Sequence, residues 1–96
     1  QEIIVQLVSI NEVFDKVLAE NPNAKILLKL DCEGEEYAIF DMLKETTYLN
    51  HVAIAIIEWH EKGASDIEKV LMHHQFKLRQ THHVTENSGM IYAIKN

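Results

Sequence analysis

Strand-like and helix-like segments alternate along this chain, and that alternation constrains its fold more than any other feature. Apolar, β-branched runs of strand length are separated by stretches in which apolar residues recur at helical spacing. Alternation of this kind predicts right-handed crossovers and a mainly parallel sheet with helices on its faces. The predicted strands are Ile3–Val8, Ile26–Leu30, Val52–Ile57, Phe76–Arg79 and Met90–Ile94.

The helices between these strands have recognisable starts. Ser9 and Ser65 each precede a glutamate at the spacing of a capping box. Glu35 and Glu36 begin the second helix, where negative charge suits the positive end of the helix dipole. The element order is therefore β-α-β-α-β-α-β-β. It predicts a single α/β domain over residues 1–96, in three layers and mainly parallel, with an antiparallel last strand.

Composition narrows the functions that the chain can have. Its net charge of -6 at pH 7 leaves no basic stripe for nucleic acid. No apolar run approaches the about 20 residues that cross a membrane, and no signal peptide precedes the first strand. Cys32 is the single cysteine, which excludes an internal disulfide and fits a reducing compartment. We therefore expect a cytoplasmic domain that binds neither nucleic acid nor membranes.

Acidic side chains gather where two predicted strands end. Asp31 and Glu33 follow the second strand, and Glu58 and His60 follow the third. Parallel α/β sheets place functional groups in the crevice beyond the carboxyl ends of their strands. We therefore expect these four residues to meet there, where they could act as general bases or bind a divalent metal. A structural network or a solvated loop explains the same residues, and we favour it over a metal site.

Other reactive residues carry weaker signals. Cys32 has no assigned base, so it is a poor candidate for a nucleophilic thiol. The pairs His73–His74 and His82–His83 suggest zinc, but no cysteines complete a zinc-ligand spacing around them. We therefore predict no metal. Trp59 could line a pocket or cover a sheet edge.

Four segments of the chain, the first of them Leu7–Phe14, resemble the FkbM-type S-adenosylmethionine-dependent methyltransferases. The run from Leu28 to Tyr37, LKLDCEGEEY, is similar to the family's signature, in which a strand ending in Asp-x-Glu-Gly enters a helix. Residues Ile56–His60 resemble the family's next strand, which usually ends in Glu-x-His, and Gly89–Ile94 resembles its last strand. The resemblance covers nearly the whole chain.

This resemblance implies a partial Rossmann-like sheet, equivalent to the carboxyl-terminal half of a class I methyltransferase domain. It also implies methyl transfer from S-adenosylmethionine to an oxygen of a small molecule or glycan. Asp31, Glu33, Glu58 and His60 would then border the transfer site as its catalytic residues.

The family's cofactor is held by a glycine-rich loop, and this chain has only three well-separated glycines. We therefore expect a fragment that is inactive by itself and holds no cofactor alone. The alternative function is a non-catalytic interaction or structural domain. An exposed, apolar sheet edge at Ile26–Leu30 would let such a domain pair with a second copy as a homodimer.

Overall fold

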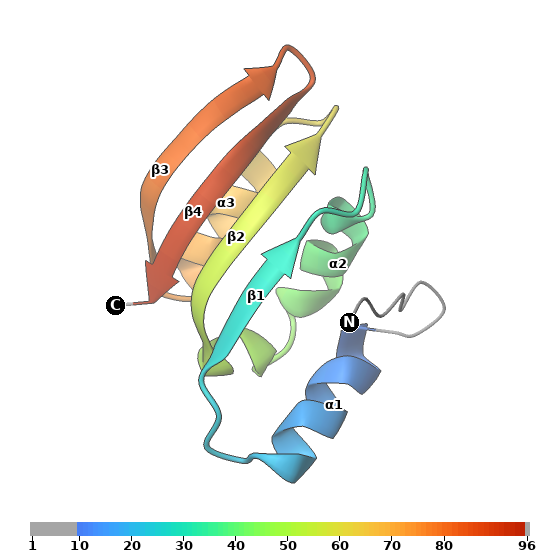
Figure 1. Cartoon of the computed structure of the whole chain (residues 1–96), viewed down its shortest axis with the longest axis vertical. Coiled ribbons are helices and arrows are strands. Elements are labelled where there is room, and N and C mark those ends of the chain that lie inside the picture. The colour runs from blue at the N-terminus through green and yellow to red at the C-terminus, as the bar shows by residue number, and fades with distance from the viewer. Residues whose placement is uncertain (1–9, 96) are drawn as a thin grey trace.

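The computed structural model describes residues 10–95 of the 96-residue chain, which fold into a four-stranded sheet and a set of helices (Figure 1). The elements are α1 (Ile10–Glu20), β1 (Ile26–Leu30), α2 (Glu36–Leu43), a 3-10 helix η1 (Tyr48–His51), β2 (Val52–His60), α3 (Ser65–His73), β3 (Phe76–Thr85) and β4 (Ser88–Lys95). The predicted strand Ile3–Val8 and the predicted cap Ser9 lie outside the described residues. The order of the remaining elements is as predicted. Across the described range, each helix is too short or too polar to cross a membrane.

The sheet is mixed, with the strand order β1-β2-β4-β3. β1 pairs parallel with β2, whereas β4 pairs antiparallel with both β2 and β3. The antiparallel orientation of the last strand is therefore confirmed. The mainly parallel sheet is not, because two of the three strand pairings in the described sheet are antiparallel. A short turn folds β4 back onto β3 and inserts it between β3 and β2, as Figure 1 shows.

Pairing with β4 also lengthens two strands beyond their predicted ends. β3 continues to Thr85 and β2 continues to His60, because both exchange hydrogen bonds with β4 over most of its length. The helix starts differ from prediction in a smaller way. Ser65 is the first residue of α3 and not its cap, and Ala64 at the cap position makes no side-chain capping bond.

One face of the sheet packs against the helices and forms a single core. Alternate strand residues point to this face, since successive side chains of a strand lie on opposite sides. They pack against apolar side chains from all three α-helices. The core contains Phe14, Leu28, Leu30, Phe40, Leu43, Leu49, Val52, Ala55, Ile57, Trp59, Ile67, Leu71, Phe76, Ile91 and Ala93.

The opposite face of the sheet is open among the described residues. Leu27, Ile54 and Ile94 lie side by side in register on three neighbouring strands. Their side chains are exposed, Leu27 by 61% and Ile54 by 41%. In a three-layer fold a second set of helices would cover this row. The described residues therefore form two layers, and the predicted third layer is not among them.

Candidate functional site

The site lies where the parallel strands β1 and β2 end next to each other. Leu30 of β1 is in register with Ile57 of β2, so Asp31 leaves the sheet beside Glu58. His60 follows Glu58 by two positions in β2 and therefore points to the same face of the sheet. Parallel pairing alone thus brings Asp31, Glu58 and His60 together.

Glu36, the first residue of α2, contacts this group through His60. Its side chain is 0% exposed, because the helical period places it on the same inner face as Phe40 and Leu43. Glu36 Oε1 accepts a hydrogen bond from the amide of Gly34 at 2.8 Å, and Oε2 accepts one from the amide of His60 at 2.7 Å. These donors offset the cost of burying a carboxylate.

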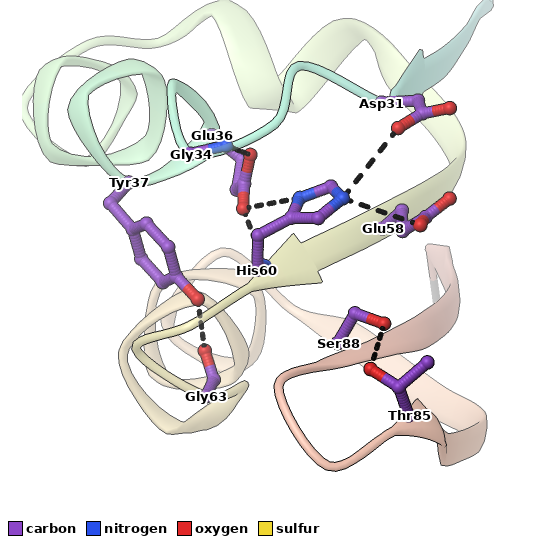
Figure 2. A network of polar contacts seen from close by, with 9 residues as sticks. All are labelled: Asp31, Gly34, Glu36, Tyr37, Glu58, His60, Gly63, Thr85 and Ser88. Atoms are coloured by element: carbon purple, nitrogen blue, oxygen red, sulfur yellow. Dashed lines mark hydrogen bonds and ion pairs between the residues drawn. The ribbon is translucent and has the colours of Figure 1, made fainter.

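His60 is oriented by the same carboxylate. Its Nδ1 lies 3.0 Å from Glu36 Oε2. Since an ionised carboxylate only accepts hydrogen bonds, Nδ1 carries a hydrogen. The opposite nitrogen, Nε2, lies 3.3 Å from Glu58 Oε2 and 3.9 Å from Asp31 Oδ1 (Figure 2). The ring is 18% exposed and Asp31 is 60% exposed, so Nε2 lies near the surface while Nδ1 faces inward.

The electrostatics of the site favour the protonated imidazole. Burial lowers the pKa of His60, but the hydrogen bond to Glu36 and the charges of Glu36, Glu58 and Asp31 raise it by more. The pKa of His60 therefore lies above the ordinary value for histidine. Chemically, the group can accept a proton or hold a cation.

Glu33, the fourth predicted site residue, is not brought to the group. Its side chain is exposed, and its backbone has a φ of 47° in the turn between β1 and α2. Gly34 follows with a φ of 107°, a conformation that favours glycine. In this turn the Glu33 side chain points to solvent, whereas the buried Glu36 side chain accepts a hydrogen bond from the amide of Gly34. The structure thus assembles Asp31, Glu58 and His60, and the catalytic role of all four residues stays a prediction.

Sequence reasoning missed the inward position of Glu36. It placed this residue only at the start of a helix, where its charge suits the dipole. The available signal was the spacing of Glu36, Phe40 and Leu43, which share one helix face. A charged residue on an apolar face is either paired or costly, so this spacing indicates a buried partner.

The other reactive residues lie apart from the site. Trp59 is buried on the helix-covered face, with its ring 5.1 Å from that of His83. His82 stacks on Tyr92. Among the described residues, the group that could bring three metal ligands together is Asp31, Glu58 and His60, and the paired histidines do not form such a group.

Cys32 does not have the character of a nucleophile. Burial raises the pKa of its thiol, and the neighbouring carboxylates, Glu36 foremost, raise it further. A backbone hydrogen bond lowers the pKa by less than burial raises it. The side chain is therefore a protonated thiol at neutral pH.

The carboxylates and the imidazole lie at the carboxyl ends of two parallel strands, which is where α/β domains commonly place functional groups. The family profile described as the methyltransferase FkbM domain matches residues 1–85 of the chain. The chain therefore belongs to the FkbM methyltransferase family, as its sequence motifs predicted. Searches of curated proteins and of solved structures found no match.

The family resemblance implies S-adenosylmethionine, which class I methyltransferases hold with a glycine-rich loop. Gly34 and Gly63 lie in separate turns, and Gly89 lies within β4 against the ring of Trp59. The glycines therefore form no loop through which the backbone could approach a cofactor closely.

Proposed function

We propose that this chain forms the methyl-acceptor side of an S-adenosylmethionine-dependent O-methyltransferase. The observation that supports it best is the Glu36–His60 pair, which presents Nε2 between Glu58 and Asp31 at the strand ends. Methyl transfer to oxygen requires a hydroxyl to be positioned and to lose its proton. These groups can do both.

Each residue has a distinct part in this proposal. Asp31 and Glu58 accept hydrogen bonds from the acceptor alcohol, and a carboxylate oxygen of one of them takes its proton beside the protonated His60 ring. As the bond from oxygen to the methyl carbon forms, the oxygen–hydrogen bond and the methyl–sulfur bond of the donor would both break, and the donor's sulfur would leave as the thioether of S-adenosylhomocysteine. Glu36 does not touch the acceptor. It is a positioning residue that fixes the His60 ring through Nδ1 and the backbone amide.

The acceptor class we propose is an alcohol of a small molecule or a glycan, because the site opens to solvent at Asp31. The cofactor would be held by residues outside the described range, since the described glycines form no loop for it. We propose the cytoplasm as the location, which a free Cys32 fits.

Because the described glycines form no cofactor loop, we propose that the chain is one part of a longer enzyme, and a methyl-transfer assay on that enzyme tests the proposal. Labelled methyl groups are followed from S-adenosylmethionine to a panel of alcohols and glycans. Glu58→Gln should lower the rate by about 100-fold or more, whereas Glu35→Gln, which removes an exposed charge from the same acidic turn, should not. Absence of transfer to any alcohol, or equal rates for both variants, would contradict it.

The proposal that this chain holds no cofactor alone has its own test. Calorimetric titration of the isolated chain with S-adenosylmethionine should give no measurable heat of binding. Micromolar affinity would show that the chain contains the cofactor site, and the division of roles proposed above would then be wrong.

A second candidate function, self-association, is supported by the outer strand β1. β1 lies at an edge of the described sheet, and Leu27 on its open face is largely exposed. An apolar outer strand can pair with another strand, and the simplest partner is a second copy of the chain. We propose a homodimer with a continuous sheet.

Sedimentation at micromolar concentration tests this candidate. The wild-type chain should sediment as a dimer that dissociates on dilution, and Leu27→Lys should shift it to the monomer. Met72→Lys is the matched control, because it places the same charge at an exposed apolar position on α3, away from β1. A wild-type monomer at every concentration, or an equal effect of both variants, would count against the dimer.

A further inference from the structure

We infer that Asp31, Glu58 and His60 form a binding site for a divalent transition-metal cation. The inference deepens the proposed function and rests on it in one respect, because the ion would lie where the acceptor hydroxyl binds. The ligand atoms are His60 Nε2, a Glu58 oxygen and an Asp31 oxygen, all within 4.8 Å of one another. Small shifts of two partly exposed carboxylates would bring them around one ion.

The way His60 is held supports the inference. Metal-binding histidines usually donate a hydrogen bond from their second ring nitrogen to a carboxylate or carbonyl oxygen, which fixes the ring orientation and its tautomer. Here Glu36 does this through Nδ1, and the same oxygen also accepts the backbone amide of His60. Nε2 is therefore the ring nitrogen directed toward the two carboxylates, and it would release its proton to bind an ion. This arrangement is built before any ion binds.

The charge balance of the group is a second, independent observation. Three carboxylates, Asp31, Glu36 and Glu58, surround one imidazole, and Glu36 is fully buried. Within residues 10–95, the ion pair that involves a lysine joins Lys44 to Asp41, and no arginine forms one. Neither lysine nor arginine therefore pairs with the carboxylates of this group. Even a protonated His60 leaves the group with excess negative charge. A divalent cation that takes the place of the Nε2 proton would reduce this excess.

The ligand types indicate which cation. One imidazole nitrogen with two carboxylate oxygens suits Mn²⁺, Fe²⁺ or Zn²⁺ better than Ca²⁺, which prefers oxygen ligands alone. Three protein ligands leave positions open for an alcohol oxygen. A cation there would lower the pKa of that hydroxyl, and its proton would pass to a free carboxylate oxygen or to water. Nε2 would then bind the ion in place of a proton.

Titration of the 96-residue chain with Mn²⁺ alone tests the inference. Calorimetry should show one ion per chain, and paramagnetic broadening in NMR should begin at the ring of His60. Glu58→Gln and Asp31→Asn should each weaken Mn²⁺ binding by about tenfold or more. The wild-type chain should bind Ca²⁺ about tenfold or more weakly than Mn²⁺. Glu35→Gln, an equal loss of charge in the same turn, should leave the affinity unchanged.

Three outcomes would overturn the inference: no saturable binding, broadening that begins at His73 and His74, or equal weakening by Glu35→Gln and Glu58→Gln. The amide NMR spectra of the variants establish that each is folded, so a lost affinity reports the site. The titration contains neither methyl donor nor acceptor. If no metal binds, the proposed function is still decided by the methyl-transfer assay. If that assay shows no methyl transfer, the metal site is not contradicted.

Discussion

One oxygen of Glu36 accepts hydrogen bonds from both the backbone amide and the ring of His60, 24 positions further along the chain. The carboxylate is fully buried, and its other oxygen binds the amide of Gly34. The start of α2, the turn before it and the end of β2 are therefore joined through one side chain. This linkage, and not any of the exposed acids, gives the candidate site its shape.

Glu36→Gln should destabilise the fold. The amide group of glutamine would face donors that now bind a carboxylate, and one of them would lose its acceptor. We expect a loss of about 1–3 kcal/mol in the free energy of unfolding, measured in urea. The neighbouring Glu35→Gln should cost less than about 1 kcal/mol, because Glu35 is exposed and makes no capping bond. Equal losses would show that burial of Glu36 is unimportant.

The pKa of His60 should exceed about 6.5, the ordinary value for histidine. Burial lowers this pKa, but the hydrogen bond to Glu36 and the nearby carboxylates raise it by more. Because the folded pKa is raised, the imidazolium stabilises the fold below about pH 6.5, and this contribution is lost as the pH rises through the folded pKa. NMR titration of the ring in a buffer with chelator measures it. Glu36→Gln should lower the value, and an unchanged pKa would contradict the role of Glu36.

Gly89→Ala should be more damaging than Gly34→Ala. A β-carbon at Gly89 would collide with the backbone carbonyl of His82 and lie 2.6 Å from the ring of Trp59. We expect a cost of about 1–3 kcal/mol or more, since paired strands cannot move apart easily. At Gly34 the added carbon meets open space and only the left-handed backbone is strained, at about 1 kcal/mol. Urea unfolding of both variants compares them, and the opposite ranking would refute the packing of Trp59 on β4.

Alkylation of Cys32 should be slow at neutral pH. The raised pKa of its thiol, caused first by burial and then by nearby carboxylates, keeps the reactive thiolate scarce. The rate with iodoacetamide should lie below that of a free cysteine in a short peptide and rise when the chain is unfolded in urea. A folded chain that reacts faster than the peptide would identify Cys32 as an activated nucleophile instead.

Local patterns were enough to locate most of the secondary structure and three residues of the candidate site. The spacing of apolar residues along α1 and the apolar run Ile26–Leu30 depend only on near neighbours in the chain, so the sequence predicts them directly. Asp31, Glu58 and His60 could be placed together because each follows a strand, and parallel strands end at one edge. The family motifs in the same stretches led to the same residues.

The tertiary structure alone decided how the sheet is assembled and how the site is held. The insertion of β4 between β2 and β3 depends on pairings between strands, and periodicity does not encode which strands pair. The turn through Glu33 and Gly34 has left-handed backbone at both residues, which rotates Glu33 outward and Glu36 inward. The acidic residues between Asp31 and Glu36 cannot be told apart in the sequence, but only Glu36 is buried and hydrogen-bonded to His60. The sequence therefore determined which residues reach the site, and three-dimensional packing determined which of them orders it.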